Sequence, residues 1–276
     1  MISTEEKQEV KNLYATYAES VMAGESLPLI DSANYAFCRK RYREAELALI
    51  PPVALRLACG GGNPVELADI QPGGVVVDLG CGGGIDMVLA AHKVAEHGKL
   101  LGIDIAPEMI TAARQAITES DLKPHIFFRT ADIEDISLLP RNFADTVLAN
   151  GVVNLCPDRT TVYKNIFRIL RPGGILIVAD FVLTEEIDHD LLARLRTDRT
   201  GCLGGAVATE DHLQILKKFT LDILRVDHND LIAEDLKTIA GYPDRDLHEG
   251  PSPNDLLQLQ GKVAVVTIMA KRRPLN

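Results

Sequence analysis

The chain has 276 residues, a formal net charge of −10 and a hydrophobic content of 46%, enough for a substantial core in one large domain or one domain with additions. Its acidity argues against a nucleic-acid substrate held through phosphates, and no apolar run is long enough to span a bilayer. Five widely spaced cysteines without a CxxC pair indicate reduced thiols, so a cytoplasmic protein without nucleic-acid or membrane partners is expected.

The first part of the chain has helical patterns but no alternation of strands and helices. Val10, Leu13, Tyr17 and Val21 fall on one face of a helix predicted over residues 4–23. Shorter helices are predicted over residues 44–49, 53–58 and 64–68, with a loop over 27–42 and a flexible turn over 59–64. Residues 1–68 are therefore interpreted as a helical cap over a ligand site.

Residues 73–86, GGVVVDLGCGGGID, predict the opening unit of a nucleotide-binding α/β fold. A β-branched apolar run suits a strand buried on both faces, and a turn with glycine at every second position from Gly80 follows it. A helix is predicted from Met87 onward. The dinucleotide fingerprint needs one more glycine, where this chain has Ile85, so an NAD-dependent reductase is disfavoured.

The acids beside this turn favour a cationic or zwitterionic ligand. A pyrophosphate would have no use for Asp78, whereas S-adenosylmethionine (SAM) carries an ammonium and a sulfonium group. Asp104 ends the next predicted strand about twenty residues later, where this fold places a carboxylate on the ribose hydroxyls. The pattern therefore indicates SAM.

The rest of the chain continues the alternation of strands and helices. Strands are predicted over residues 99–104, 126–129, 143–150, 175–180, 221–226 and 262–270. Helices are predicted from Pro107 and over residues 158–170 and 210–218. No helix follows the final strand, which suits an antiparallel insertion. Residues 69–276 are interpreted as the SAM-binding domain, with 190–260 on the acceptor side and 234–260 the least readable part.

Four motifs carry a family resemblance. The chain resembles the class I SAM-dependent methyltransferases in DLGCGGG at 78–84, GID at 102–104, ADIE at 131–134 and LRPGG at 170–174. It is similar to the arsenite methyltransferase family in CGGGNPV at 59–65, NGVVNLCPD at 150–158 and GCLGGA at 201–206. The resemblance implies a Rossmann-like α/β fold, with a seven-stranded, mostly parallel sheet and an N-terminal helical cap. It also implies SAM as cofactor and S-adenosylhomocysteine as product.

The resemblance implies a role for each cofactor-side residue. Asp78 faces the methionine part, Asp104 the ribose hydroxyls and Asp132 the adenine amine. The expected cofactor-binding set is Asp78, Gly80, Gly82, Asp86, Asp104, Ile105, Met109, Asp132, Ile133 and Asn150. Purely structural roles remain open for three of these residues. Asp132 could cap a helix, Asp86 could interact favourably with the dipole at a helix N-terminus, and Met109 could be an ordinary core residue. No metal site is expected.

The acceptor side departs from the family pattern at one position. The family has a cysteine where this chain has Gly151, and it holds trivalent arsenic with three thiolates, ligands that soft ions prefer. Cys59 and Cys202 match the other two positions, and Cys156 could supply a third thiol. The candidate catalytic residues are Asn150, Cys202, Cys156 and Cys59. The bland alternative is that the cysteines are small buried hydrophobes.

Because of Gly151, the leading hypothesis is a methyltransferase acting on a small organic acceptor. Arsenite bound to thiols is the alternative acceptor, and a non-catalytic SAM-binding protein is a further alternative. The expected partner is the small-molecule substrate alone, and the chain is expected to be a monomer or a homodimer.

Overall fold

The computed structural model describes residues 4–25, 40–122, 125–197, 203–240 and 252–274. Its strands are β1 Val75–Leu79, β2 Lys99–Asp104, β3 His125–Thr130, β4 Ala144–Asn150, β5 Leu170–Leu183, β6 Val207–Ala208, β7 Leu221–Asp230 and β8 Val263–Arg272. Its helices are α1 Thr4–Met22, α3 Glu44–Leu47, α4 Pro52–Arg56, α5 Pro64–Leu67, α6 Ile85–Val94, α7 Pro107–Glu119, α8 Arg159–Ile169, α9 His189–Thr197, α10 Thr209–Lys218, α11 Ala233–Ala240 and α12 Pro253–Leu257, with a 3-10 turn at Val153–Leu155. None of these helices is long and apolar enough to cross a bilayer.

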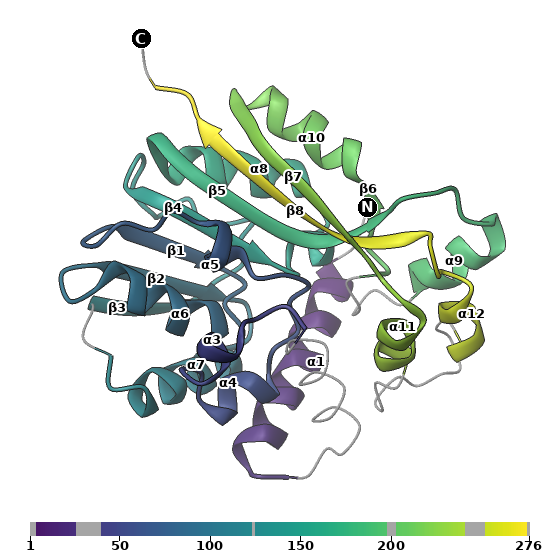
Figure 1. The fold of residues 1–276 in the computed structure, drawn as a ribbon, viewed down its shortest axis with the longest axis horizontal. Coiled ribbons are helices and arrows are strands. Elements are labelled where there is room, and N and C mark those ends of the chain that lie inside the picture. The colour runs from purple at the N-terminus through teal and green to yellow at the C-terminus, as the bar shows by residue number, and fades with distance from the viewer. Residues whose placement is uncertain (1–3, 26–39, 123–124, 198–202, 241–251, 275–276) are drawn as a thin grey trace.

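The strands form one twisted sheet in the order β3-β2-β1-β4-β5-β8-β7 (Figure 1). The pairs among β1 to β5 are parallel, and β8 inserts antiparallel between β5 and β7. The two-residue strand β6 pairs with the end of β5 as an eighth strand. The predicted seven-stranded, mostly parallel sheet and the antiparallel place of the final strand are confirmed.

The buried strands divide their side chains between two cores because successive residues point to opposite faces of a sheet. Val76 of β1 and Leu148 of β4 join a core with α6 and α7. Val77 of β1 and Val147 of β4 join a second core with α8 and α10. These strands are apolar on both faces, as expected for a parallel sheet covered by helices on both sides.

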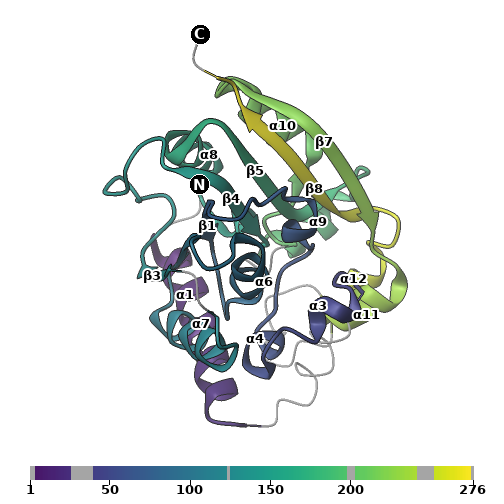
Figure 2. The same ribbon diagram turned by 60° about the vertical axis from the view of Figure 1, so that its left-hand side comes forward.

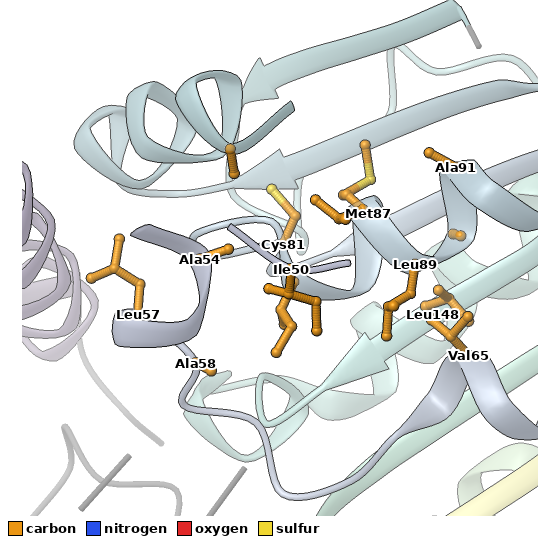
Figure 3. Close-up of a cluster of buried hydrophobic side chains, with 14 of the residues drawn as sticks. Ile50, Ala54, Leu57, Ala58, Val65, Cys81, Met87, Leu89, Ala91 and Leu148 are labelled. Carbon is orange, nitrogen blue, oxygen red and sulfur yellow. The ribbon is translucent and has the colours of Figure 1, made fainter. Parts of the chain in front are cut away.

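The N-terminal segment shares the first of these cores. Helix α1 lies along α7 (Figure 2). Ile50 lies beside Cys81, and Ala54 and Leu57 of the neighbouring segment belong to the same core as Met87 of α6 (Figure 3). The described residues of this segment, 4–25 and 40–68, thus share a core with the Gly loop, α6 and α7 rather than forming one of their own. The division at residue 68 stays a prediction.

Several element boundaries differ from the predictions. Strand β5 begins at Leu170, not at 175, because Leu170 pairs with Ala144 and a shift in register then absorbs residues 171–174. It continues past Asp180 to Leu183 because β8 pairs with it along that whole length. Helix α9 was not predicted. Helices α11 and α12 lie in the least readable stretch, whose residues 241–251 fall outside the described part.

The predicted flexible turn over residues 59–64 is instead a packed loop. Gly61, Gly62 and Asn63 are buried, and a Cβ on Gly62 would lie 2.8 Å from the Cβ of Ala179 in β5. The glycines allow the backbone to lie directly on the sheet, so this stretch is glycine-rich because of close packing and not because of exposure.

Candidate functional site

A cleft of about 930 Å³, part of it open to solvent, lies at the carboxyl ends of β1, β2 and β4. This is where the strand order reverses between β1 and β4, the place where open α/β sheets bind ligands. The cleft is lined by the predicted residues Cys59, Gly80, Gly82, Asp86, Asp104, Ile105, Met109, Asp132, Ile133, Asn150 and Cys156. Asp78 lies buried next to the Gly loop without lining the cleft, and Cys202 lies outside the described residues.

The loop after β1 has the backbone that its glycines predict. Gly80, Gly82 and Gly84 have φ values of +69°, +48° and +89°, which L side chains rarely adopt. A Cβ on Gly80 would lie 2.5 Å from Val152, so this glycine permits close packing. At Gly82 a Cβ would meet nothing within 4 Å, which leaves room for a ligand against the loop backbone.

Asp104 braces this loop from the neighbouring strand. One carboxylate oxygen accepts a hydrogen bond from Gly82 N at 2.9 Å, and the other accepts one from Ala106 N at 3.0 Å. Burial raises the pKa of Asp104, and these backbone donors oppose the rise. Each oxygen keeps a second lone pair, so the carboxylate can hold the loop and still accept two ligand hydroxyls.

Two more buried acids lie next to Asp104. Burial raises the pKa of Asp78 well above its usual range, and Asp86 and Asp104 raise it further. Oδ2 of Asp78 is buried and has no hydrogen-bond partner among the residues that the structure describes. Burial also raises the pKa of Asp86 to about 6, against the hydrogen bonds from Asn150 and Tyr42. A buried acceptor without a donor, among three acids, fits a ligand that brings an ammonium or sulfonium charge.

Lys7 is a cleft residue that the sequence prediction missed. Its ammonium contacts Asp132 at 2.6 Å and Glu134 at 2.8 Å, and all three residues line the cleft. Burial is the largest single effect on the pKa of Lys7 and lowers it. The hydrogen bonds and charges of the two carboxylates together outweigh burial, so the pKa of Lys7 is raised. The sequence predicted the helix over residues 4–23 that carries Lys7, but not the contact. Lys7 and Asp132 are 125 positions apart in the chain, and no sequence pattern links them.

The cleft is also lined by two thiols, Cys59 and Cys156, and by Gly151, the residues expected on the acceptor side. Burial raises the pKa of the Cys59 thiol to about 12. Burial and the nearby Glu134 and Asp132 raise the pKa of Cys156 well above its usual value, and its thiol donates to the Val152 carbonyl. Gly151, between them, has φ +72°. Both thiols are therefore protonated at neutral pH.

Comparison with known families supports this geometry. Residues 70–220 match a family model described as a methyltransferase domain, which covers more than half of the chain. The chain is 34% identical over 195 residues to an arsenite methyltransferase of Halobacterium salinarum, a match that covers 70% of this chain and 48% of the relative. It is 32% identical over 133 residues to a trans-aconitate 2-methyltransferase of Azoarcus, covering 48% of this chain and 49% of the relative.

A solved structure agrees on the fold. The crystal structure of an arsenic(III) S-adenosylmethionine methyltransferase from Chlamydomonas reinhardtii superposes with a TM-score of 0.62 and 24% identity, covering 84% of this chain and 73% of that one. The chain spans about half the length of the curated relatives that it matches. With the sheet order, the Gly loop and the three acids, these matches show that the chain belongs to the methyltransferase-domain family, as a class I SAM-dependent methyltransferase related to the arsenite methyltransferases.

Proposed function

We propose that this chain transfers a methyl group from SAM to a small organic acceptor, which enters the cleft beside Cys59, Gly151 and Cys156. The observation that carries the choice of acceptor is the wall formed by these three residues. It has a left-handed glycine where the arsenite enzymes are expected to have a thiol, so that the described part of the cleft is lined on this side by two thiols, those of Cys59 and Cys156.

The cofactor side follows from the residues already described. When bound, SAM supplies a methyl group already activated by its sulfonium sulfur. Asp104 accepts the ribose hydroxyls while it braces Gly82. Asp78 offers its unpartnered oxygen to the ammonium end, directly or through water. Buried Met109 and Ile133 bracket the adenine ring, and Asp132 accepts the adenine amine.

The chain's contribution to the chemistry is alignment in a pocket that excludes water. An in-line displacement needs the acceptor atom held behind the methyl carbon, and it needs little proton transfer. Leu155, Val152 and Pro157 provide an apolar surface at the acceptor end. An acceptor with a nucleophilic O, N, C or S atom on a compact apolar body fits this wall.

The test is to measure S-adenosylhomocysteine release from SAM with two kinds of acceptor. One arm is a panel of small carboxylic acids, amines, phenols and thiols, and the other is arsenite with excess glutathione. We expect release with at least one organic acceptor and none with arsenite. SAM binding by titration calorimetry without release in either arm would indicate the non-catalytic alternative and would overturn the proposal.

A second candidate is methylation of thiol-bound arsenite. It is favoured by the presence of Cys59 and Cys156 in the same cleft and by the arsenite methyltransferase relatives. If arsenite is methylated, Cys59→Ser and Cys202→Ser should each reduce the rate by at least tenfold, with an unchanged Kd for SAM in each variant as the control. Loss of arsenite methylation in these two variants would replace the organic acceptor with arsenic.

A further inference from the structure

The loop over residues 59–62 is held by one side chain. Asn150, the final residue of β4, accepts a hydrogen bond from Gly62 N through Oδ1 at 3.1 Å and donates to Gly62 O through Nδ2 at 2.9 Å. A Cβ on Gly60 would lie 2.4 Å from the Asn150 side chain, so the loop backbone rests directly on the amide. The amide thus pairs with the loop as a neighbouring strand would.

The same amide is fixed from its other side. Nδ2 of Asn150 also donates to Asp86 Oδ2 at 2.9 Å, and Tyr42 Oη donates to Asp86 Oδ1 at 2.9 Å. Asp86 is 3% exposed and is the second residue of α6, directly after the Gly loop. A continuous set of hydrogen bonds therefore runs from Tyr42 through Asp86 and Asn150 to Gly62.

Only an amide satisfies this arrangement. Position 150 must accept from one backbone N–H and donate both to a carbonyl and to a carboxylate. An aspartate there would lose both donors and place a second negative charge against Asp86. A leucine would leave the Gly62 groups and the Asp86 carboxylate without their partner, in a buried site where unmet hydrogen bonds are costly.

We infer that Asn150 is a positioning residue that fastens the loop carrying Cys59 to the first turn of α6, so that the cofactor side of the cleft sets the place of the acceptor side. That this attachment matters for catalysis rests on the proposed function. That the loop is attached at all follows from the hydrogen bonds among Tyr42, Asp86, Asn150 and Gly62.

Protonation of Asp86 should loosen this attachment. The charged groups that act electrostatically across this site are Glu46 of α3 and Asp78 of β1, both acids, while Tyr42 and Asn150 donate to the carboxylate. The pKa of Asp86 is about 6. Below that pH one of its two acceptor oxygens becomes a hydroxyl, so Asn150 and Tyr42 can no longer both donate to a carboxylate.

The test follows the loop itself in the full-length protein without cofactor or acceptor. Hydrogen exchange at Gly62 N–H and alkylation of Cys59, each read by mass spectrometry, report opening of residues 59–62. We expect both to be roughly tenfold faster in Asn150→Asp. They should be a few-fold faster in Tyr42→Phe, which removes the donor to Asp86 and the acceptor of a longer hydrogen bond from Asn150 Nδ2. Tyr163→Phe, which removes a buried hydroxyl bonded to His212, is the control and should leave both rates unchanged.

A second test uses the wild-type protein, so its result does not depend on whether a variant folds. Gly62 protection, corrected for intrinsic exchange, should fall as pH drops, with a midpoint near 6. Tyr42→Phe should move the midpoint upward, because the Tyr42 hydrogen bond lowers the Asp86 pKa. Unchanged rates in Asn150→Asp, or pH-independent protection, would overturn the inference. Neither result requires methyl transfer, so failure here is separate from failure of the proposed function.

Discussion

Asp104 has two tasks because a carboxylate has four lone-pair sites. It accepts from Gly82 N and Ala106 N and retains two sites for ligand hydroxyls. Asp78 and Gly80 belong to the same local unit of strand and turn. These residues could be placed from sequence because the unit is continuous in the chain. Lys7 could not, because its partners Asp132 and Glu134 come close only through folding.

Substituting Asp104 tests this reading of the carboxylate. Asp104→Asn keeps the shape but exchanges one acceptor oxygen for a donor that faces a backbone N–H or a ligand hydroxyl. A hydrogen bond to a charged group contributes ~1.5–3 kcal/mol, so the Kd for SAM should rise by roughly 10- to 100-fold. Titration calorimetry measures it, with the exposed Asp222→Asn as control. Equal Kd values for wild type and Asp104→Asn would contradict the assignment.

Helix α1 closes the side of the cleft on which the adenosine of SAM is proposed to bind. Lys7, Val10 and Tyr14 line the cleft from this helix, while Tyr17 and Val21 pack in the core. The amphipathic pattern predicted the helix, and α1 ends within one residue of the expected boundary. The pattern did not show which other helix it would contact. That depends on α7, with which it shares an apolar face formed from residues about 100 positions apart.

Weakening the contact between α1 and the strand ends should speed cofactor release. Lys7→Met removes the ion pairs with Asp132 and Glu134, which are only partly shielded from water. Such pairs contribute about 0.2–1 kcal/mol, so the SAM dissociation rate should rise by roughly two- to fivefold. Stopped-flow chase with S-adenosylhomocysteine measures this rate. Lys11→Met on the same helix is the control, and an identical change in both variants would count against a specific role of Lys7.

Across the whole molecule, acids dominate the buried charge. Burial raises the pKa of Asp78, Asp86, Asp104 and Asp180, the last to about 7. The strands themselves and the acids at the ends of β1 and β2, Asp78 and Asp104, were predictable because strand ends follow from hydrophobic runs. Asp180 was expected to end its strand, but β8 prolongs that strand past it, and the carboxylate instead accepts from Asn154 N and Phe181 N. Long-range pairing of this kind has no local signature.

These acids set the sign of the pH dependence of stability. An acid with a raised folded pKa holds its proton in the folded state, so stability is full below the unfolded pKa and is lost as pH rises through the folded pKa. With folded values of about 6 for Asp86 and about 7 for Asp180, the free energy of unfolding should fall from about pH 4, the unfolded value of an aspartate, to slightly above pH 7. His212, whose pKa burial lowers to about 4, opposes this only below about pH 6.5.

Urea unfolding of the protein without cofactor at pH 5.5 and pH 8 measures the difference. SAM should raise the melting temperature more at pH 8, where its positive charge meets ionised carboxylates. Asp180→Asn should flatten the profile of the protein without cofactor, since that position then no longer titrates. A free energy of unfolding that rises from pH 5.5 to pH 8 would show that the buried acids do not govern it.

The antiparallel place of β8 has a consequence for how the chain is made. Strand β8 covers the edge of β5, yet protein synthesis reaches Val263 only 80 residues after Leu183. At about 5–20 residues per second the ribosome needs ~4–16 s for that stretch. During this interval the nascent chain presents a long apolar strand with unpaired N–H and C=O groups, a template for aggregation. The edge of β5 that β8 covers therefore stays unpaired by β8 until the last part of the chain has been synthesised.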